Sequence, residues 1–191
     1  MIIGIMGYSG SGKSTLSEEF KKLGAYVIDA DKIGKDILSP EGDALKRVVD
    51  AFGEDILFSD KSLNRKKLGE IVFKDKKSLD ILNGITWEAI NEEIIKRAKS
   101  STERIIIIDC PLLYKVSAYD LCNEVIFIDT PDSVMIDRIM KRDGICFDTA
   151  VARINSQKDE NFKNYATIII ENTDMASLTK KAAELMKGWL K

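Results

Sequence analysis

The sequence predicts an α/β fold built on a five-stranded parallel sheet with helices on both faces. Short runs of apolar, mostly β-branched residues recur along the chain. Each run is continuous rather than alternating, which is typical of strands buried on both faces. Segments with helical periodicity separate the runs, as in β-α-β units. The five expected strands are Ile2–Met6, Ala25–Ile28, Arg104–Ile108, Glu124–Ile128 and Thr167–Ile170.

Three helices are expected between and after these strands. Lys13–Leu23 follows a glycine-rich turn and ends before Gly24, a residue type that suits the position after a helix. Ser133–Arg142 stops close to Gly144 in the same way. Ala176–Leu190 carries apolar residues close to a helical period, which indicates a helix that packs on the core.

The stretch between the second and third strands, from about residue 29 to residue 103, is far longer than a simple crossover needs. Its periodicity predicts helices at 32–38, 42–52, 64–73, 76–84 and 87–99. We expect one domain, residues 1–191, with a helical subdomain inserted at about 32–100. An insertion near the carboxyl ends of the strands would hold a second substrate.

Composition excludes several classes of protein. Lys and Arg number 29 against 31 Asp and Glu, a net charge of −2, which argues against non-specific nucleic-acid binding. Histidine is absent, so Ser-His-Asp triads and His-ligated zinc are excluded. Three widely spaced cysteines without a C-x-x-C pair favour reduced thiols and a cytoplasmic protein. No apolar run reaches about 18 residues, so we expect no membrane span.

One motif carries most of the functional signal. Residues 7–14 match the phosphate-loop (P-loop) pattern G-x-x-x-x-G-K-[ST] between an expected strand and helix, which makes this a predicted P-loop NTPase fold. The glycines let backbone N–H groups turn toward a phosphate at the positive end of the helix. Lys13 should reach the β- and γ-phosphates of ATP, and the Ser14 hydroxyl should bind Mg²⁺. The expected nucleotide-binding residues of the loop are Gly7, Ser9, Gly10, Ser11, Gly12, Lys13, Ser14 and Thr15.

Carboxylates follow two of the expected strands. Asp29 and Asp31 come directly after the second strand, and in an extended chain they would share a face. A carboxylate there could accept a proton from an attacking hydroxyl, and the alternative is capping of the next helix. Asp109 ends the third strand, where it could hold a Mg²⁺-bound water.

Arg138, Arg142 and Arg153 form a basic set. Arg138 and Arg142 are four residues apart and share a helix face. Guanidinium groups stabilise charge on a transferring phosphoryl group and often lie on a lid, which we expect at about 138–160. The alternative is a solvated helix surface. In the insertion, Arg65 could contact a phosphate-rich substrate.

Taken in order, the motifs resemble those of the dephospho-CoA kinase family over nearly the whole chain. Outside the insertion, the segments that carry the resemblance after the phosphate loop are Val27–Asp31, Pro111–Leu113, Arg142–Gly144, Arg153–Gln157 and Ala166–Asn172. Within the insertion they are Phe52–Gly53, Ile56–Leu57, Leu63–Arg65, Leu68 and Val72–Phe73. The resemblance implies an enzyme that transfers the γ-phosphate of ATP to the ribose 3′-hydroxyl of dephospho-CoA, the last step of CoA biosynthesis. We expect ATP and Mg²⁺ as cofactors, small-molecule partners only, and a monomer or weak homo-oligomer.

The resemblance also implies roles for single residues. Asp31 would be the base, because it matches the second Asp of the family's D-A-D motif. Arg142 would lie in the lid and contact the phosphates. From the residues themselves we expect Arg138 to bind the nucleotide as well and Lys13 to act in catalysis. The expected acceptor contacts are Asp31, Arg65 and Leu112.

Three departures from the family pattern fall in the region expected to bind the acceptor. Thr86-Trp87 stands where the family usually has His-Pro, and Lys115 replaces the acidic residue of P-L-L-F-E. The basic residues expected just after Arg153–Gln157 are weakly represented, by Lys158 and Lys163. Drift at tolerant positions explains all three, and the alternative is a related P-loop kinase acting on another nucleoside, nucleotide or small hydroxylated metabolite. A nucleotide-binding switch without an acceptor is a further alternative, but no water-positioning residue is identifiable.

Overall fold

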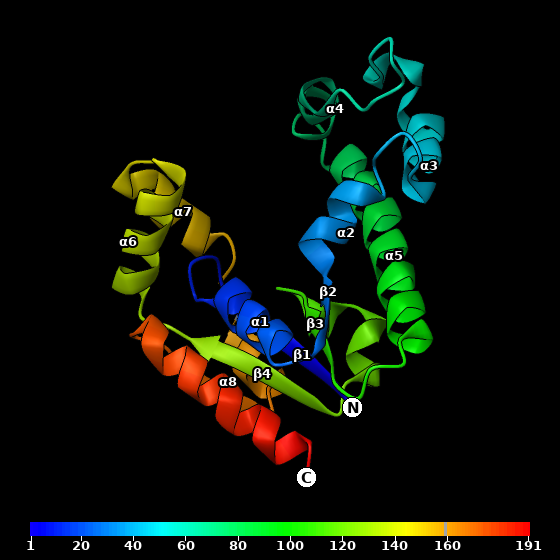
Figure 1. Ribbon diagram of the computed structural model, residues 1–191. Coiled ribbons are helices and arrows are strands. Elements are labelled where there is room, and N and C mark those ends of the chain that lie inside the picture. The colour runs from blue at the N-terminus through cyan, green and yellow to red at the C-terminus, as the bar shows by residue number, and fades with distance from the viewer. Residues whose placement is uncertain (159) are drawn as a thin grey trace. The chain divides into compact units, whose positions relative to one another are not determined.

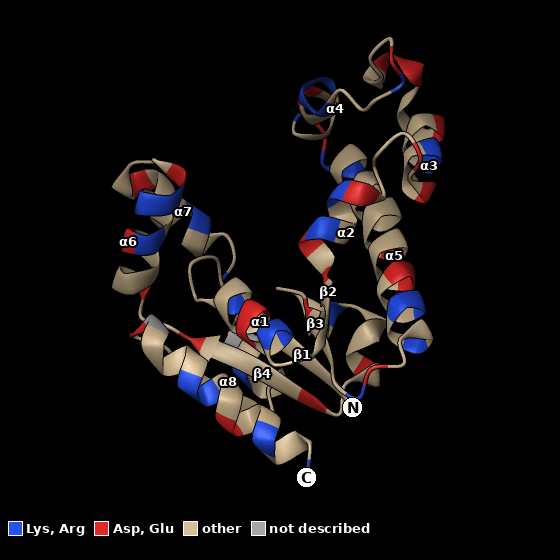
Figure 2. Ribbon diagram, in the orientation of Figure 1, with Lys and Arg blue, Asp and Glu red and all other residues tan. Residues whose placement is uncertain are grey.

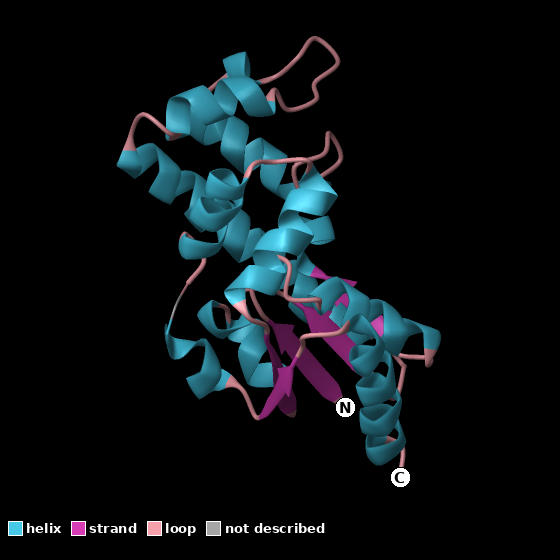
Figure 3. Cartoon of the chain, turned by 90° about the vertical axis from the view of Figure 1, so that its left-hand side faces the viewer, coloured by secondary structure: helices cyan, strands magenta, loops and turns pink. Residues whose placement is uncertain are grey.

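The computed structural model describes residues 1–158 and 160–191 and divides into two compact units (Figure 1). The first unit consists of Met1–Ile28 and Ala98–Lys191. The second unit is Asp29–Arg97, in which helices alternate with loops (Figure 3). The phosphate loop therefore belongs to the first unit.

Five strands of the first unit form one sheet in the order β2-β3-β1-β4-β5. They are β1 (Ile2–Met6), β2 (Tyr26–Asp29), β3 (Ile106–Asp109), β4 (Glu124–Asp129) and β5 (Ile168–Glu171). The pairs β1–β3, β1–β4 and β4–β5 are parallel, and Ile3 lies opposite both Ile107 and Glu124. The predicted five-stranded parallel sheet is confirmed, with β1 as its central strand.

One face of the sheet is covered by α1 (Lys13–Lys22) and α8 (Met175–Trp189), which contact each other through the rings of Phe20 and Trp189, whose centroids lie 5.3 Å apart. Phe20 of α1 and Met186 of α8 join Ile5 of β1 in one buried apolar cluster. Alternate residues of a strand face opposite sides of a sheet, so this cluster uses only half of each strand.

The opposite face is covered by short 3₁₀ helices, namely η2 (Leu113–Lys115), η3 (Ser117–Leu121) and η4 (Glu160–Tyr165). Gly4 of β1 allows a close approach there, because a Cβ at this position would lie 2.2 Å from Leu113 Cδ2. With both faces buried, every position of a central strand must be apolar or small, which explains the continuous apolar runs in the sequence.

The remaining helices are divided between the two units. The first unit also holds α6 (Asp132–Asp143) and α7 (Phe147–Asn155), and α6 ends at Gly144 with φ +64°. The helices of the second unit are α2 (Ala30–Asp36), α3 (Asp43–Phe52), η1 (Glu54–Ile56), α4 (Arg65–Val72) and most of α5 (Lys76–Ser100). No helix in the described part of the chain is long and apolar enough to cross a membrane.

The prediction of two helices at 76–84 and 87–99 is wrong, because α5 runs through both without a break. Gly84 lies on an open side of the helix, with nothing within 4 Å of the place its Cβ would take. The Thr86 hydroxyl donates to the Leu82 carbonyl at 2.8 Å, one turn back along the same helix. Glycine and threonine here are tolerated inside a helix that longer-range packing supports.

Replacing Ile5 by alanine should lower the free energy of unfolding by about 2–5 kcal/mol, because a fully buried side chain leaves a cavity in the central strand. Ile169→Ala is the matched control, since Ile169 lies in β5 of the same sheet and is 49% exposed. Ile169→Ala should lower the free energy of unfolding by about 0.5 kcal/mol. Urea unfolding of both variants measures the difference, and equal losses would contradict the assignment of the core.

Candidate active site

The phosphate loop connects β1 to α1 at the centre of the sheet. Gly10 and Gly12 have φ angles of +79° and +104°, a region that favours glycine. A Cβ on Gly10 would also lie 2.9 Å from the carbonyl oxygen of Met135 in α6. Two constraints, backbone conformation and close packing against α6, therefore require glycine at position 10.

The N-terminus of α1 has no capping side chain. Gly12 is the N-cap residue, and Lys13, Ser14 and Thr15 form the first turn of this ten-residue helix. The N–H groups of a first helical turn have no partner within their helix, and the helix dipole is positive there. The Lys13 ammonium donates to the Tyr8 carbonyl at 3.4 Å, which keeps it beside the loop. The arrangement suits a phosphate group.

Helix α6 and the residues that follow α7 contact the loop. Helices α6 and α7 pack together through a buried cluster of Met135, Ile139, Ala150 and Ile154. Arg138 of α6 donates from Nη1 to the Gly10 carbonyl at 3.2 Å, and the Ser9 N–H donates to Gln157 Oε1 at 2.8 Å. Gln157 was part of a motif in the sequence, but its contact with the loop could not be predicted because it lies 148 residues away along the chain.

The Asp143 carboxylate pairs with two of the three arginines that the sequence predicted near the phosphates. Arg142 donates to the Asp143 carboxylate from Nε at 2.7 Å and from Nη2 at 2.9 Å, and Arg153 is bonded to the same carboxylate. Arg142 Nη2 also lies 3.4 Å from Ser9 Oγ, so this guanidinium reaches the phosphate loop. Figure 2 shows the Lys and Arg residues that α6 carries.

These ion pairs shift the pKa values of Asp143 and Arg142. Hydrogen bonds from Arg142, and then from Arg153, lower the pKa of Asp143 to about 2. The bond to Asp143 raises the pKa of Arg142. Both groups are therefore charged at neutral pH, and the two guanidinium groups share one carboxylate beside the loop.

Asp109 lies at the carboxyl end of β3 and is 9% exposed. Its Oδ2 accepts a hydrogen bond of 2.7 Å from the hydroxyl of Ser17, a residue of α1 that is 4% exposed. Sequence reasoning missed Ser17, although one signal was present. It is a polar residue within the buried stripe of α1, between Leu16 and Phe20.

The donor set at this edge of the sheet fits Mg²⁺. Ser14 and Asp109 supply a hydroxyl and a carboxylate, the hard oxygen ligands that Mg²⁺ prefers. Among the described residues no group of three or more His, Cys, Asp or Glu side chains forms a metal cage. Mg²⁺ is usually bound by one or two protein ligands together with substrate phosphates and water.

Two predicted site residues lie in the second unit. Asp31 is exposed in the first turn of α2, and Arg65 is the exposed first residue of α4. Asp29 is the N-cap of α2, where its carboxylate accepts the Lys32 N–H at 2.9 Å. The expectation that Asp29 and Asp31 share a face of an extended chain is wrong, because the helix begins at Ala30. Asp29 has the capping role that was the alternative.

Leu112 precedes η2 in the first unit and is half-buried. Within that unit the structure therefore brings the phosphate loop together with Arg138 and Arg142, and places Asp109 at the end of the strand next to β1. Asp31 and Arg65 belong to the other unit.

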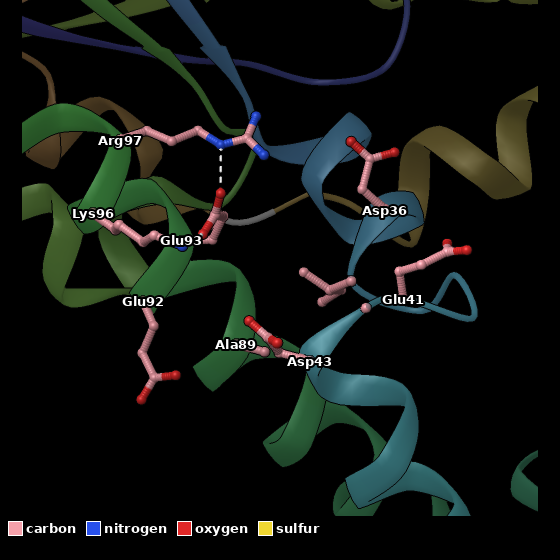
Figure 4. Close-up of a pocket in the computed structure, with 10 residues that line it drawn as sticks. Asp36, Glu41, Asp43, Ala89, Glu92, Glu93, Lys96 and Arg97 are labelled. Atoms are coloured by element: carbon pink, nitrogen blue, oxygen red, sulfur yellow. Dashed lines mark hydrogen bonds and ion pairs between the residues drawn. The ribbon is translucent and has the colours of Figure 1, made fainter. Parts of the chain in front are cut away.

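The second unit contains a pocket of about 310 Å³ (Figure 4). Its acidic lining residues are Asp36, Glu41, Asp43, Glu92 and Glu93. The two basic residues, Lys96 and Arg97, both pair with Glu93, at 3.3 and 2.7 Å, and these hydrogen bonds lower the pKa of Glu93. The excess of carboxylates makes this pocket a poor site for a phosphate-rich molecule.

Known proteins match the chain over nearly its whole length. A family model described as dephospho-CoA kinase matches residues 1–177. The dephospho-CoA kinase of Lactobacillus johnsonii is 39% identical over 190 residues, which cover 97% of this chain and 96% of that protein. The dephospho-CoA kinase of Carboxydothermus hydrogenoformans is 38% identical over 193 residues, with coverage of 98% and 94%.

Solved structures also match the chain over nearly its whole length. The dephospho-CoA kinase from Campylobacter jejuni is 30% identical with a TM-score of 0.70, and the match covers 97% of this chain and 95% of that one. A shikimate kinase from Bacteroides thetaiotaomicron, 18% identical, matches with a TM-score of 0.58 over 98% of both chains. The second likeness concerns the fold alone, and it confirms the predicted P-loop kinase fold.

The ion pairs of Asp143 should resist acid. Because folding lowers the pKa of this group from 3.8 to about 2, its contribution to stability is complete above about pH 4 and is lost as the pH falls through 2. The carboxyl-carbon NMR shift of Asp143 should therefore change little between pH 5 and pH 3. In Arg142→Gln it should titrate in that range, and more so than in Arg153→Gln. Identical titration curves in all three proteins would contradict the pairing.

Proposed function

The chain belongs to the dephospho-CoA kinase family, and we propose that its phosphate loop, its lid arginines and Asp31 carry out that family's reaction. The enzyme transfers phosphate from ATP to the ribose 3′-hydroxyl of dephospho-CoA, which gives CoA in the last step of CoA biosynthesis. The observation that carries the mechanism is the uncapped N-terminus of α1, with an intact glycine loop and Lys13 beside it.

The ATP phosphates bind at the phosphate loop, residues 7–15. Backbone N–H groups at the N-terminus of α1 and the Lys13 ammonium provide the positive charge. Arg138 and Arg142 contribute from α6, where they already contact the backbone and the Ser9 hydroxyl of the loop. These groups offset negative charge as it builds on the transferring phosphoryl group.

Ser14 and Asp109 would hold Mg²⁺ together with the nucleotide. The hydroxyl and the carboxylate are hard oxygen ligands, and the Ser17 hydroxyl restricts how Asp109 is oriented. When bound, Mg²⁺ neutralises phosphate charge and orients the γ-phosphate.

Asp31 accepts the proton of the ribose 3′-hydroxyl as that oxygen bonds to the γ-phosphorus and ADP leaves. Chain connectivity supports this role, because Asp31 comes three residues after Ile28 near the carboxyl end of β2. In parallel sheets, the carboxyl ends of the strands meet at one edge, and the phosphate loop follows β1 at that edge.

The second unit contains the residues proposed to bind the acceptor, including Arg65, while Leu112 contributes from the first unit. The lid comprises residues 138–160, of which residue 159 lies outside the described residues. Lid closure would exclude water and so prevent hydrolysis of ATP. ATP and dephospho-CoA are the small-molecule partners of a cytoplasmic enzyme that is a monomer or weak homo-oligomer.

Two of the departures from the family pattern have local structural roles. The Thr86 hydroxyl bonds to carbonyls of its own helix, at 2.8 Å for Leu82 and 3.2 Å for Asn83. The Lys115 ammonium lies 5.3 Å from the centre of the Tyr114 ring, in cation–π geometry. Neither contact favours a different acceptor.

Asp31→Asn should lower kcat by about 10²–10⁴-fold while ATP binding is retained, because the amide cannot accept the proton. Asp29→Asn is the matched control, since asparagine caps a helix as well as aspartate does. Steady-state kinetics and isothermal titration with ATP measure both effects. An unchanged kcat in Asp31→Asn would exclude this residue as the base.

The acceptor is tested by measuring ADP release with ATP, Mg²⁺ and a panel of dephospho-CoA, nucleosides, nucleotides and no acceptor. Only dephospho-CoA should stimulate release, with CoA as product. Equal release without any acceptor would indicate a nucleotide hydrolase, and stimulation by a nucleoside alone would overturn the assigned acceptor.

A further inference from the structure

The carbonyl of Ser11, in the middle of the phosphate loop, receives hydrogen bonds from two buried side chains. Thr130 donates from Oγ1 at 3.0 Å, and Asn172 donates from Nδ2 at 2.6 Å. Thr130 is 5% exposed and Asn172 is fully buried. A carbonyl oxygen has two lone pairs, so these two donors satisfy it. Arg138 Nη1, at 3.5 Å, is a weaker third neighbour.

The two donor residues each lie directly after a strand of the sheet. Thr130 directly follows β4 and precedes Pro131, the N-cap of α6. Asn172 directly follows β5, and its own backbone N–H donates to the Asp129 carbonyl at 2.8 Å. The carboxyl ends of the two strands on one side of β1 therefore both bond to a single carbonyl of the loop.

The loop needs such restraint because its glycines leave its backbone free to move. Gly10 and Gly12, on either side of Ser11, have positive φ angles, and glycine populates many other conformations as readily. In a planar trans peptide the C=O and N–H point in opposite directions. When the Ser11 carbonyl is held toward β4 and β5, the Gly12 N–H is held pointing away from them.

We propose that Thr130 and Asn172 are positioning residues that hold the Ser11–Gly12 peptide in its phosphate-binding orientation before nucleotide binds. The inference rests on the proposed function, in which this loop binds the phosphates of ATP. Without the two bonds, part of the binding free energy would be used to order the loop. Neither residue touches the substrate in this role, since both act through the loop backbone.

Thr130→Val tests the proposal, because valine has the same shape as threonine and lacks the donor. The dissociation constant of Mg-ADP, measured by isothermal titration without acceptor, should rise about fivefold, the effect of one lost hydrogen bond. Thr130→Ser keeps the hydroxyl and should restore most of the affinity. Asn172→Asp puts a carboxylate against the Ser11 carbonyl and should weaken binding by about tenfold or more.

Thr167→Val is the matched control for a purely structural effect. The Thr167 hydroxyl oxygen accepts the Val125 N–H at 2.8 Å at the other end of β4, away from the loop. Both threonine-to-valine variants should lower the melting temperature of the nucleotide-free protein. Only Thr130→Val should weaken ADP binding.

The outcomes separate this inference from the proposed function. If wild type fails to bind ADP, or Lys13→Ala binds it as tightly as wild type, the proposed function fails. If wild type binds ADP and Thr130→Val binds it equally well, the positioning role is wrong. Equal weakening in Thr130→Val and Thr167→Val would show that affinity follows stability alone, which also overturns it.

Discussion

The backbone conformation of the phosphate loop is the constraint on which the rest of the site depends. A loop that presents N–H groups to an anion requires positive φ angles at Gly10 and Gly12, and such a loop cannot be rigid by itself. Its order comes from its surroundings. The central strand and α1 hold its two ends, α6 packs against Gly10, and buried donors after β4 and β5 bond to Ser11.

A second constraint on the site is the mutual repulsion of the cationic side chains beside the loop. Binding a polyphosphate requires cations, but cations brought close together without an anion repel one another. Asp143 resolves this, because one carboxylate pairs with both Arg142 and Arg153 while Arg142 still reaches Ser9. The pocket of the second unit has the opposite character, with an excess of carboxylates. The basic groups that suit phosphate are thus gathered at the loop.

Local pattern was sufficient for much of the fold but failed at two helix boundaries. The continuous apolar runs predicted all five strands, although only the three central strands β1, β3 and β4 are buried along most of their length. The boundary at Asp29 and the length of α5 were misjudged. At Asp29 the chain turns at once into a helix that the Asp29 carboxylate caps. At Gly84 the 25-residue helix continues, because a single exposed glycine costs a helix only about 1 kcal/mol.

The sequence by itself determined the phosphate loop, the strand before it and the helix after it, because glycine spacing and apolar runs encode local backbone geometry. Its motifs also predicted the family, which the family match over residues 1–177 confirmed. Only the tertiary structure decided which side chains serve the loop. Ser17 on Asp109, Gln157 on Ser9, and Thr130 and Asn172 on Ser11 are pairs separated by 92 to 161 residues. Asp109, Thr130 and Asn172 lie at or directly after the carboxyl ends of parallel strands, and Gln157 follows α7. These contacts form only when the whole unit folds, so no local sequence pattern predicts them.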